Sequence, residues 1–185
     1  MNIIKLSAIL LSIAFLYGCA SGAKMENMIY DGTSIDKSQF DRSLKQQVSV
    51  DTVSGGEETN PMWTSEISNE AFSGAVKQSL NNMGLLAPKG RYQLNVKLLN
   101  VDQPLFGFDM TVTTNVQYTL TDIKTGRVIF DRKVSAAHTA TVSDAFVAIT
   151  RLRLANEGSG KKNIEALLKH LLRLKIKPGN ISMMQ

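Results

Sequence analysis

The chain has few of the residues from which cross-links and metal sites are built. Its 185 residues include one cysteine and two histidines. A single cysteine forms no intrachain disulfide, and together with two histidines it leaves almost nothing for a multi-ligand zinc site. His138 and His170 have no HxxxH or HxxE spacing around them. We therefore expect neither a metal nor a cofactor.

Catalytic motifs are also absent. No serine lies in a GxSxG context, and the glycine-rich Ser54-Gly55-Gly56 lacks the lysine of a GxxxxGK[ST] phosphate loop. We expect no catalytic residue and no enzymatic activity.

An uncharged apolar run stands at the N-terminus, where Leu6 to Tyr17 follows Lys5. As a helix, its 12 residues would span about 18 Å, short of the ~30 Å hydrocarbon core of a bilayer. The run therefore fits the hydrophobic region of a secretory signal rather than a transmembrane anchor.

The end of this run, Leu16-Tyr17-Gly18-Cys19, resembles the lipobox of bacterial lipoproteins. Leu16 and Gly18 match the pattern, while Tyr17 stands where a small residue is usual. The resemblance implies that residues 1–18 are a signal peptide and that Cys19 carries the lipid on its sulfur and its amine. Alanine rather than aspartate follows the cysteine, which by the same resemblance favours the outer membrane, with the domain facing the periplasm.

The remaining chain divides into a short leader, one domain and a tail. The apolar residues of 19–44 do not recur with the period of a helix or a strand, and this segment is expected to be a lipidated N-terminus and tether. Residues 45–177 are expected to form a single domain, and residues 178–185 a flexible tail. The domain opens with a predicted strand over about 45–53, followed by a helix that Ser65 caps and Gly84 ends.

The clearest pattern is an alternation that predicts a strand with one buried and one wet face. Between residues 108 and 121, the even-numbered positions are apolar except at Thr114, and the odd-numbered positions are polar. The apolar residues are Phe108, Met110, Val112, Val116, Tyr118 and Leu120. A strand over 92–98 precedes it, and a hairpin at Gly126 leads to a return strand over 127–139.

A helical segment over 143–174, opened by Ser143 and Asp144 and with Phe146 on its apolar face, closes the domain. Gly158-Ser159-Gly160 interrupts it, so the segment is either kinked, split into two helices, or packed closely on the sheet through its glycines. The order β-α-β-β-β-α predicts an α/β (α+β) two-layer sandwich with a mostly antiparallel sheet and both helices on one face.

Two groups of residues are candidate contact sites. Leu105, Phe106 and Phe108 stand near a predicted hairpin tip, where they either contact a membrane or a partner or cap the open end of the core.

The second group is basic and lies on the last helix, and it consists of Lys161, Lys162, Lys169 and Arg173. Residues 19–122 carry 8 basic and 12 acidic side chains, whereas residues 123–185 carry 12 and 4. The basic group is either a solvated helix face or a patch for anionic headgroups such as those of lipopolysaccharide. Nucleic acid is not expected as a partner, because the expected location of the domain is the periplasm and no aromatic residues interleave with the basic ones.

The whole pattern resembles small Gram-negative outer-membrane lipoproteins of the YajG, LptE and ABC-auxiliary types. The resemblance rests on the lipobox, on the hairpin residues 116–130, and on Ala155-Asn156-Glu157 and Asn163-Ile164. It implies a non-catalytic lipoprotein that supports an envelope assembly or transport complex through protein contacts. The alternative is a periplasmic module that binds lipid or glycolipid.

Overall fold

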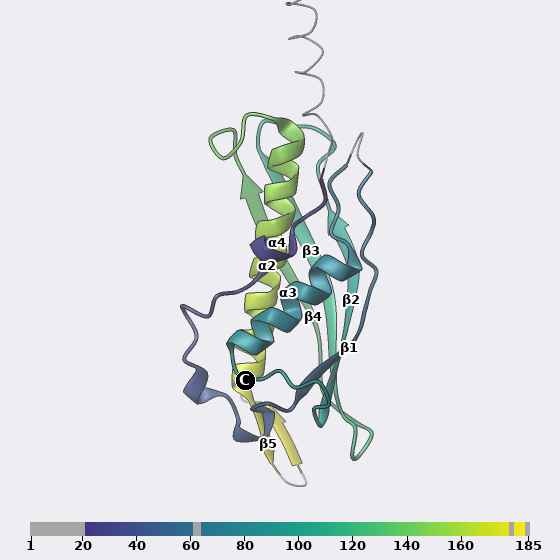
Figure 1. The fold of residues 1–185 in the computed structure, drawn as a ribbon, viewed down its shortest axis with the longest axis vertical. Coiled ribbons are helices and arrows are strands. Elements are labelled where there is room, and N and C mark those ends of the chain that lie inside the picture. The colour runs from purple at the N-terminus through teal and green to yellow at the C-terminus, as the bar shows by residue number, and fades with distance from the viewer. Residues whose placement is uncertain (1–20, 61–63, 178–179, 184–185) are drawn as a thin grey trace, which may run out of the picture.

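Four strands form the main sheet. The computed structural model describes residues 21–60, 64–177 and 180–183, and the sheet consists of β1 (Val48–Ser54), β2 (Tyr92–Asp102), β3 (Met110–Asp122) and β4 (Arg127–Ala140). The strands lie in the order β1-β2-β3-β4, with β1 parallel to β2 and the other neighbours antiparallel (Figure 1). The mostly antiparallel sheet predicted from the sequence is confirmed.

The alternation along β3 places its apolar parity in the core. Val112, Val116, Tyr118 and Leu120 are fully buried, and the polar parity between them is exposed or half-buried. Phe108 departs from the prediction: it precedes the strand and is exposed. The pairing explains this, because Asp102, the last residue of β2, already stands opposite Thr113.

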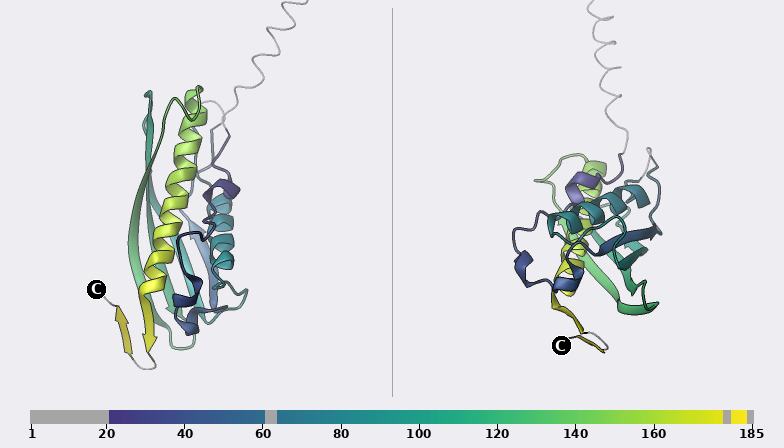
Figure 2. Two further views of the ribbon diagram at one scale, coloured as in Figure 1. Left: turned by 90° about the vertical axis from the view of Figure 1, so that its left-hand side faces the viewer. Right: turned by 60° about the horizontal axis from the view of Figure 1, so that its bottom comes forward.

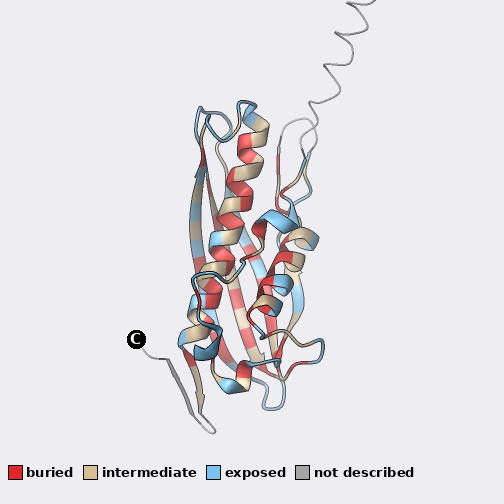
Figure 3. Cartoon of the chain, turned by 60° about the vertical axis from the view of Figure 1, so that its left-hand side comes forward, coloured by how far each residue is buried: buried red, intermediate tan, exposed pale blue. Residues whose placement is uncertain are grey.

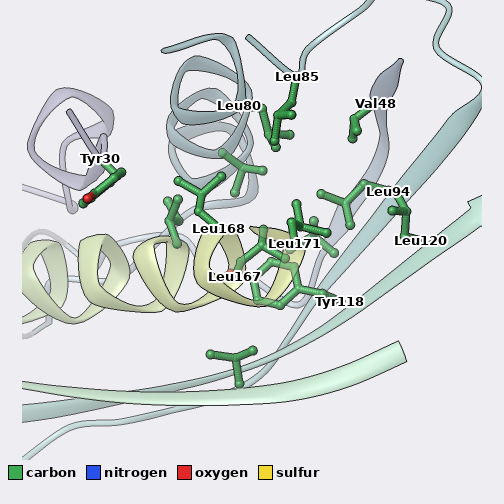
Figure 4. Packing of buried hydrophobic residues seen from close by; sticks show 14 of the residues in the cluster. Tyr30, Val48, Leu80, Leu85, Leu94, Tyr118, Leu120, Leu167, Leu168 and Leu171 are labelled. Carbon is green, nitrogen blue, oxygen red and sulfur yellow. The ribbon is translucent and has the colours of Figure 1, made fainter. Parts of the chain in front are cut away.

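Two helices cover one face of the sheet, α3 (Asn69–Asn82) and α4 (Ala148–Arg173). Figure 2 shows both on the same side of the strands, and Figure 3 shows the buried residues that run along the length of α4. Their leucines join the strand residues in one core, in which Leu167 and Leu171 of α4 lie between Leu80 of α3 and Tyr118 of β3 (Figure 4). The predicted two-layer sandwich is confirmed.

Helix α3 begins later than predicted, and a different serine caps it. Ser68, not Ser65, is the N-cap, and its hydroxyl accepts a hydrogen bond from the Ala71 N–H at 3.2 Å. Ser65 is fully buried in the extended segment before the helix, where its hydroxyl donates to the Ser21 carbonyl at 2.8 Å. Gly84 ends the helix as predicted, with a φ of 70° that glycine adopts without strain.

Helix α4 is continuous through its two glycines. A Cβ at Gly158 would lie 1.9 Å from Cδ2 of His138 on β4, and one at Gly160 would lie 2.8 Å from Sδ of Met28. Of the alternatives predicted for this segment, close packing through the glycines is therefore the one observed. At Gly158 the helix lies so close to the sheet, and at Gly160 so close to the N-terminal segment, that neither position has room for a larger residue.

The start of α4 differs from the prediction. The helix begins at Ala148, because Asp144 is held in a turn by the backbone N–H and the hydroxyl of Thr141. Phe146, expected on the apolar face of the helix, lies in the loop before it and is exposed.

A buried polar network joins α4 to the centre of the sheet. Thr114, the one polar member of the apolar parity, donates its N–H to the Ser159 hydroxyl at 2.9 Å. Asn163 donates to the carbonyls of Thr114 and Val134 at 3.0 and 3.1 Å, and accepts from the Tyr118 hydroxyl at 2.8 Å. The interruption in the strand pattern thus marks the place where the helix is hydrogen-bonded to the sheet.

Residues 23–44, expected as a tether, pack onto the domain instead. They contain α2 (Met25–Met28) and two 3-10 turns, η2 (Lys37–Gln39) and η3 (Arg42–Leu44). Their buried side chains join the main core; they are Ala23, Met28, Tyr30, Ile35, Phe40 and Leu44. The segment consists of one short helix and two turns joined by extended residues, so no helical or strand period marks its apolar residues.

A buried carboxylate holds the start of this segment to α4. Glu157 accepts hydrogen bonds from the Lys24 N–H at 3.0 Å and from the Asn27 side-chain amide at 2.8 Å. Further along, the Tyr30 N–H donates to the Ser79 hydroxyl of α3 at 2.9 Å. The segment is therefore attached to both helices by hydrogen bonds as well as by apolar packing.

The C-terminal residues also differ from the expected tail. Helix α4 ends at Arg173 and leads into β5 (Leu174–Lys177), which pairs antiparallel with β6 (Asn180–Met183).

Candidate docking site

Two loops at one end of the domain expose large apolar side chains. The β2–β3 loop carries Leu105, Phe106 and Phe108, of which the first two are 94% and 85% exposed. The loop between β4 and α4 carries Phe146, which is 89% exposed, and Val147. Because the predicted tip residues are this exposed, they do not cap the core, and that alternative is wrong.

Arg151 joins the two loops. This side chain is buried at the start of α4, and it donates to the carbonyls of Ala145 and Phe146 at 2.8 and 2.6 Å. It also donates to the carbonyl of Gly107 in the other loop at 3.3 Å. A guanidinium presents several donors in a fixed plane, so one side chain holds both loops in a defined relative position.

Gln103, at the base of the β2–β3 loop, connects this end to the start of the described chain. Its amide donates to the Ser65 carbonyl at 3.2 Å and to the Glu66 carboxylate at 2.7 Å. The Ser65 hydroxyl in turn donates to the Ser21 carbonyl, and the Ala23 N–H donates to the Glu66 carbonyl at 2.9 Å. The chain therefore enters the fold beside the two apolar loops.

A cavity of about 260 Å³ lies beside the β2–β3 loop. Glu57, Glu66, Gln103 and Leu105 are among its lining residues. Partial burial, with a smaller contribution from the nearby Glu57 carboxylate, raises the pKa of Glu66. The volume is below the roughly 300–1,000 Å³ typical of pockets that enclose drug-sized ligands.

The predicted basic residues lie elsewhere on α4 and do not gather into one site. Lys161 lies 3.9 Å from the Asp31 carboxylate, and Lys169 lies 2.7 Å from Glu165. Lys162 donates to a carbonyl of β4 at 3.2 Å, and Arg173 is exposed at the end of the helix.

The basic residues also lie far from the apolar loops. At 1.5 Å per residue, Lys161 is about 15 Å and Lys169 about 27 Å along α4 from Arg151. The structure therefore separates the two predicted contact groups, and headgroup binding by the basic group stays a prediction.

Both histidines are half-buried. Burial, together with the nearby Lys162 ammonium, lowers the pKa of His138, and burial lowers the pKa of His170. Within residues 21–60, 64–177 and 180–183, no three His, Cys, Asp or Glu side chains gather as metal ligands. Cys19 lies outside the described residues. Among the helices that the structure describes, none has the length and apolarity needed to cross a bilayer.

Sequence reasoning missed Phe146, Val147 and Arg151 as parts of the apolar end. The first two were assigned to a helix, and nothing local distinguishes a loop-bracing arginine from a solvated one. The Thr141-x-x-Asp144 spacing was the available signal, since it favours a turn before the helix.

Comparison with known proteins gives a fold but no family. No family model matches the chain, and no curated protein matches it. Protein XCC0632 from Xanthomonas campestris, described under the family model DUF330, has a similar structure at 14% identity, with a TM-score of 0.52 over 71% of this chain and 88% of that one. That likeness shows the fold alone.

Two further solved structures are similar at lower scores. One is a dodecamer of a PelC variant from Paraburkholderia phytofirmans, at 14% identity and a TM-score of 0.48 over 70% of this chain and 90% of that one. The other is a minor lipoprotein from Acinetobacter baumannii, at 9% identity and a TM-score of 0.47 over 69% and 93%.

Proposed function

We propose that the protein is a lipid-anchored, non-catalytic domain of the Gram-negative outer membrane that supports an envelope assembly or transport complex through protein contacts. The observation that carries the proposal is the packing of the N-terminal segment onto the domain. A lipid on Cys19 would be two residues from Ser21, a covalent reach of at most about 7 Å. The domain would then be mounted directly on the membrane surface instead of hanging from a long tether.

A mounted domain fits a scaffold better than a carrier. A lipid carrier needs an interior large enough for acyl chains, and the cavity beside the β2–β3 loop, at about 260 Å³, is below the volume of pockets that enclose drug-sized ligands. The outer surface of the sheet, in contrast, offers a broad face of exposed or half-buried polar side chains; they include Thr111, Thr113, Asn115, Gln117 and Thr119. Such a face suits contacts with another protein that are made and released.

The lipid anchor is tested first. Metabolic labelling with palmitate should label the wild-type chain and the control variant Ser21→Ala, and should not label Cys19→Ala. An unlabelled wild type, or label that persists in Cys19→Ala, would remove the basis of the proposal.

The protein contact is tested separately in cells. A photo-crosslinking residue is placed at Thr113 or Gln117 on the polar sheet face, and for comparison at buried Val116. We expect a discrete adduct from the two positions on the polar face that is lost when Cys19→Ala releases the domain from the membrane. A labelled, membrane-bound protein that gives no adduct from either of these positions would contradict a scaffold role for this face.

A further inference from the structure

The exposed apolar side chains are concentrated at one end of the molecule. Within the described residues, six of the ten exposed large hydrophobic side chains lie in the two short loops over 103–109 and 141–147. They are Leu105, Phe106, Phe108, Val142, Phe146 and Val147. Single exposed apolar residues are ordinary, but a contiguous group of this kind marks a contact surface.

This surface is held in place before any contact is made. The hydrogen bonds from Arg151 to Ala145, Phe146 and Gly107 join the two loops to each other and to the start of α4. The rings are therefore presented by braced loops, and less conformational entropy remains to be lost when they are covered.

The same end receives the chain from its lipid-bearing terminus. Ser21 is hydrogen-bonded to Ser65, whose carbonyl accepts from Gln103, two residues before Leu105. In Figure 1 the loop after β4 and the start of α4 lie at the top of the molecule, and the β3–β4 hairpin lies at the opposite end. Along β3, at about 3.4 Å per residue, the two ends are about 40 Å apart.

We propose that this apolar end is a membrane-inserting surface, and that its occupant is the lipid leaflet that holds the acyl chains of Cys19. The inference rests on the proposed lipid anchor and adds an orientation to it. The domain stands with its two braced loops in the interfacial region, and the β3–β4 hairpin points away from the membrane.

The charge of the loops indicates which kind of lipid surface they fit. The two loops carry Asp109 and Asp144 and no lysine or arginine. Arg151, at the start of α4, is buried and bonded to the loop carbonyls, and Lys161, Lys162, Lys169 and Arg173 follow farther along the helix. Insertion is therefore apolar in origin, through rings that enter the acyl boundary, and anionic headgroups add nothing to it. This separates the proposal from headgroup binding by Lys161, Lys162, Lys169 and Arg173.

The test measures depth in the bilayer with the acylated full-length protein reconstituted into phosphatidylcholine vesicles. Because Cys19 is acylated, a nitroxide attaches only to a cysteine introduced at Phe106 or Phe146, or at the control positions Ile123 and Val128. The controls are also exposed apolar residues, but they lie at the β3–β4 hairpin. Collision of the nitroxide with oxygen and with a water-soluble nickel chelate then reports whether it lies in lipid or in water.

We expect a several-fold higher ratio of oxygen to nickel accessibility at positions 106 and 146 than at 123 and 128. Adding phosphatidylglycerol to the vesicles should leave the ratios unchanged. Equal nickel access at all four positions would overturn the proposal, and so would lipid contact that appears only with phosphatidylglycerol. Spin–spin broadening between labels at position 106 would also overturn it and assign the surface to a second copy of the chain.

Failure of the anchor is distinguished from failure of insertion by the mass of the purified protein. A chain without acyl groups refutes the proposed function before any vesicle is made. An acylated chain whose Phe106→Cys label stays in water refutes the insertion alone.

Discussion

Replacing Asn163 with leucine tests whether the buried polar network holds α4 to the sheet. Asn163 is fully buried, donates to the Thr114 carbonyl and hydroxyl and to the Val134 carbonyl, and accepts from the Tyr118 hydroxyl. Leucine has a similar volume, so Asn163→Leu leaves no large cavity and removes mainly the hydrogen bonds.

The expected loss follows from the partners that are left behind. The Tyr118 hydroxyl is fully buried and loses its only hydrogen bond within the described residues, which costs about 1–3 kcal/mol. Each backbone carbonyl that loses a donor adds about 0.5–1.5 kcal/mol. We therefore expect Asn163→Leu to lower the free energy of unfolding by about 3 kcal/mol, a large part of the 5–15 kcal/mol typical of a domain.

A double-mutant cycle separates this cause from general disturbance of the core. Tyr118→Phe alone should cost about 1–2 kcal/mol, because it leaves the Asn163 amide oxygen without its donor. In the Asn163→Leu background the same change removes an orphaned hydroxyl and should be neutral or stabilising.

The assay is urea unfolding at pH 7, followed by far-UV circular dichroism on the chain without its signal segment. Asn81→Leu, at an exposed position of α3, is the matched control and should stay within about 0.5 kcal/mol of the wild type. Strict additivity of the two core substitutions, or a loss below about 1 kcal/mol for Asn163→Leu, would refute the role given to the network.

Three further substitutions test other contacts. Glu157→Gln removes an acceptor that holds the N-terminal segment, so amide hydrogen exchange over residues 24–30 should accelerate while the sheet amides stay protected. Hydrogen bonds from the Arg91 guanidinium hold the pKa of Asp122 at about 2, so the stability it provides is full above about pH 4 and lost as the pH falls toward 2. Asp122→Asn should accordingly lower the free energy of unfolding by about 1–2 kcal/mol at pH 7, and its urea midpoint should converge with that of the wild type in acid. A difference between the two midpoints that does not change with pH would argue against the ion pair. Gly158→Ala should destabilise the protein by about 1–3 kcal/mol through overpacking against the His138 ring. In a His138→Ala background the same change should stabilise it by up to about 1 kcal/mol. Thermal melts in which Gly158→Ala shifts the melting temperature in the same direction in both backgrounds would refute the contact.

If Cys19 carries the lipid as proposed, the packing of the N-terminal segment also limits how the domain can turn on the membrane. A domain attached through so short a connection would present one face to the membrane, and its reach would be set by its own length. Partners would then meet it at the polar sheet face or along α4, on the sides of the upright domain.

Local patterns were sufficient for the main elements of the fold. The alternation along β3 determined a strand with one wet face, since successive side chains of a strand point to opposite sides. Gly84 marked the end of α3 because only glycine takes a positive φ there without strain. Placing both helices on one face then followed from the need to cover a single apolar surface.

The remaining features depend on contacts between distant parts of the chain. Lys24 and Glu157 are hydrogen-bonded although they lie 133 positions apart in the sequence. No periodic spacing of apolar residues in 23–44 predicts that this segment packs onto the helices. The same holds for Arg151, which joins two loops that lie more than thirty residues apart in the sequence.

By itself, the sequence determined the order of strands and helices, because these depend on periods of two and 3.6 residues. Only the tertiary structure decided that the glycines of α4 serve close packing, that the expected tether is part of the domain, and that the exposed rings gather beside the point where the chain enters. Each of these is a matter of which distant surfaces meet, and that is settled by packing in three dimensions.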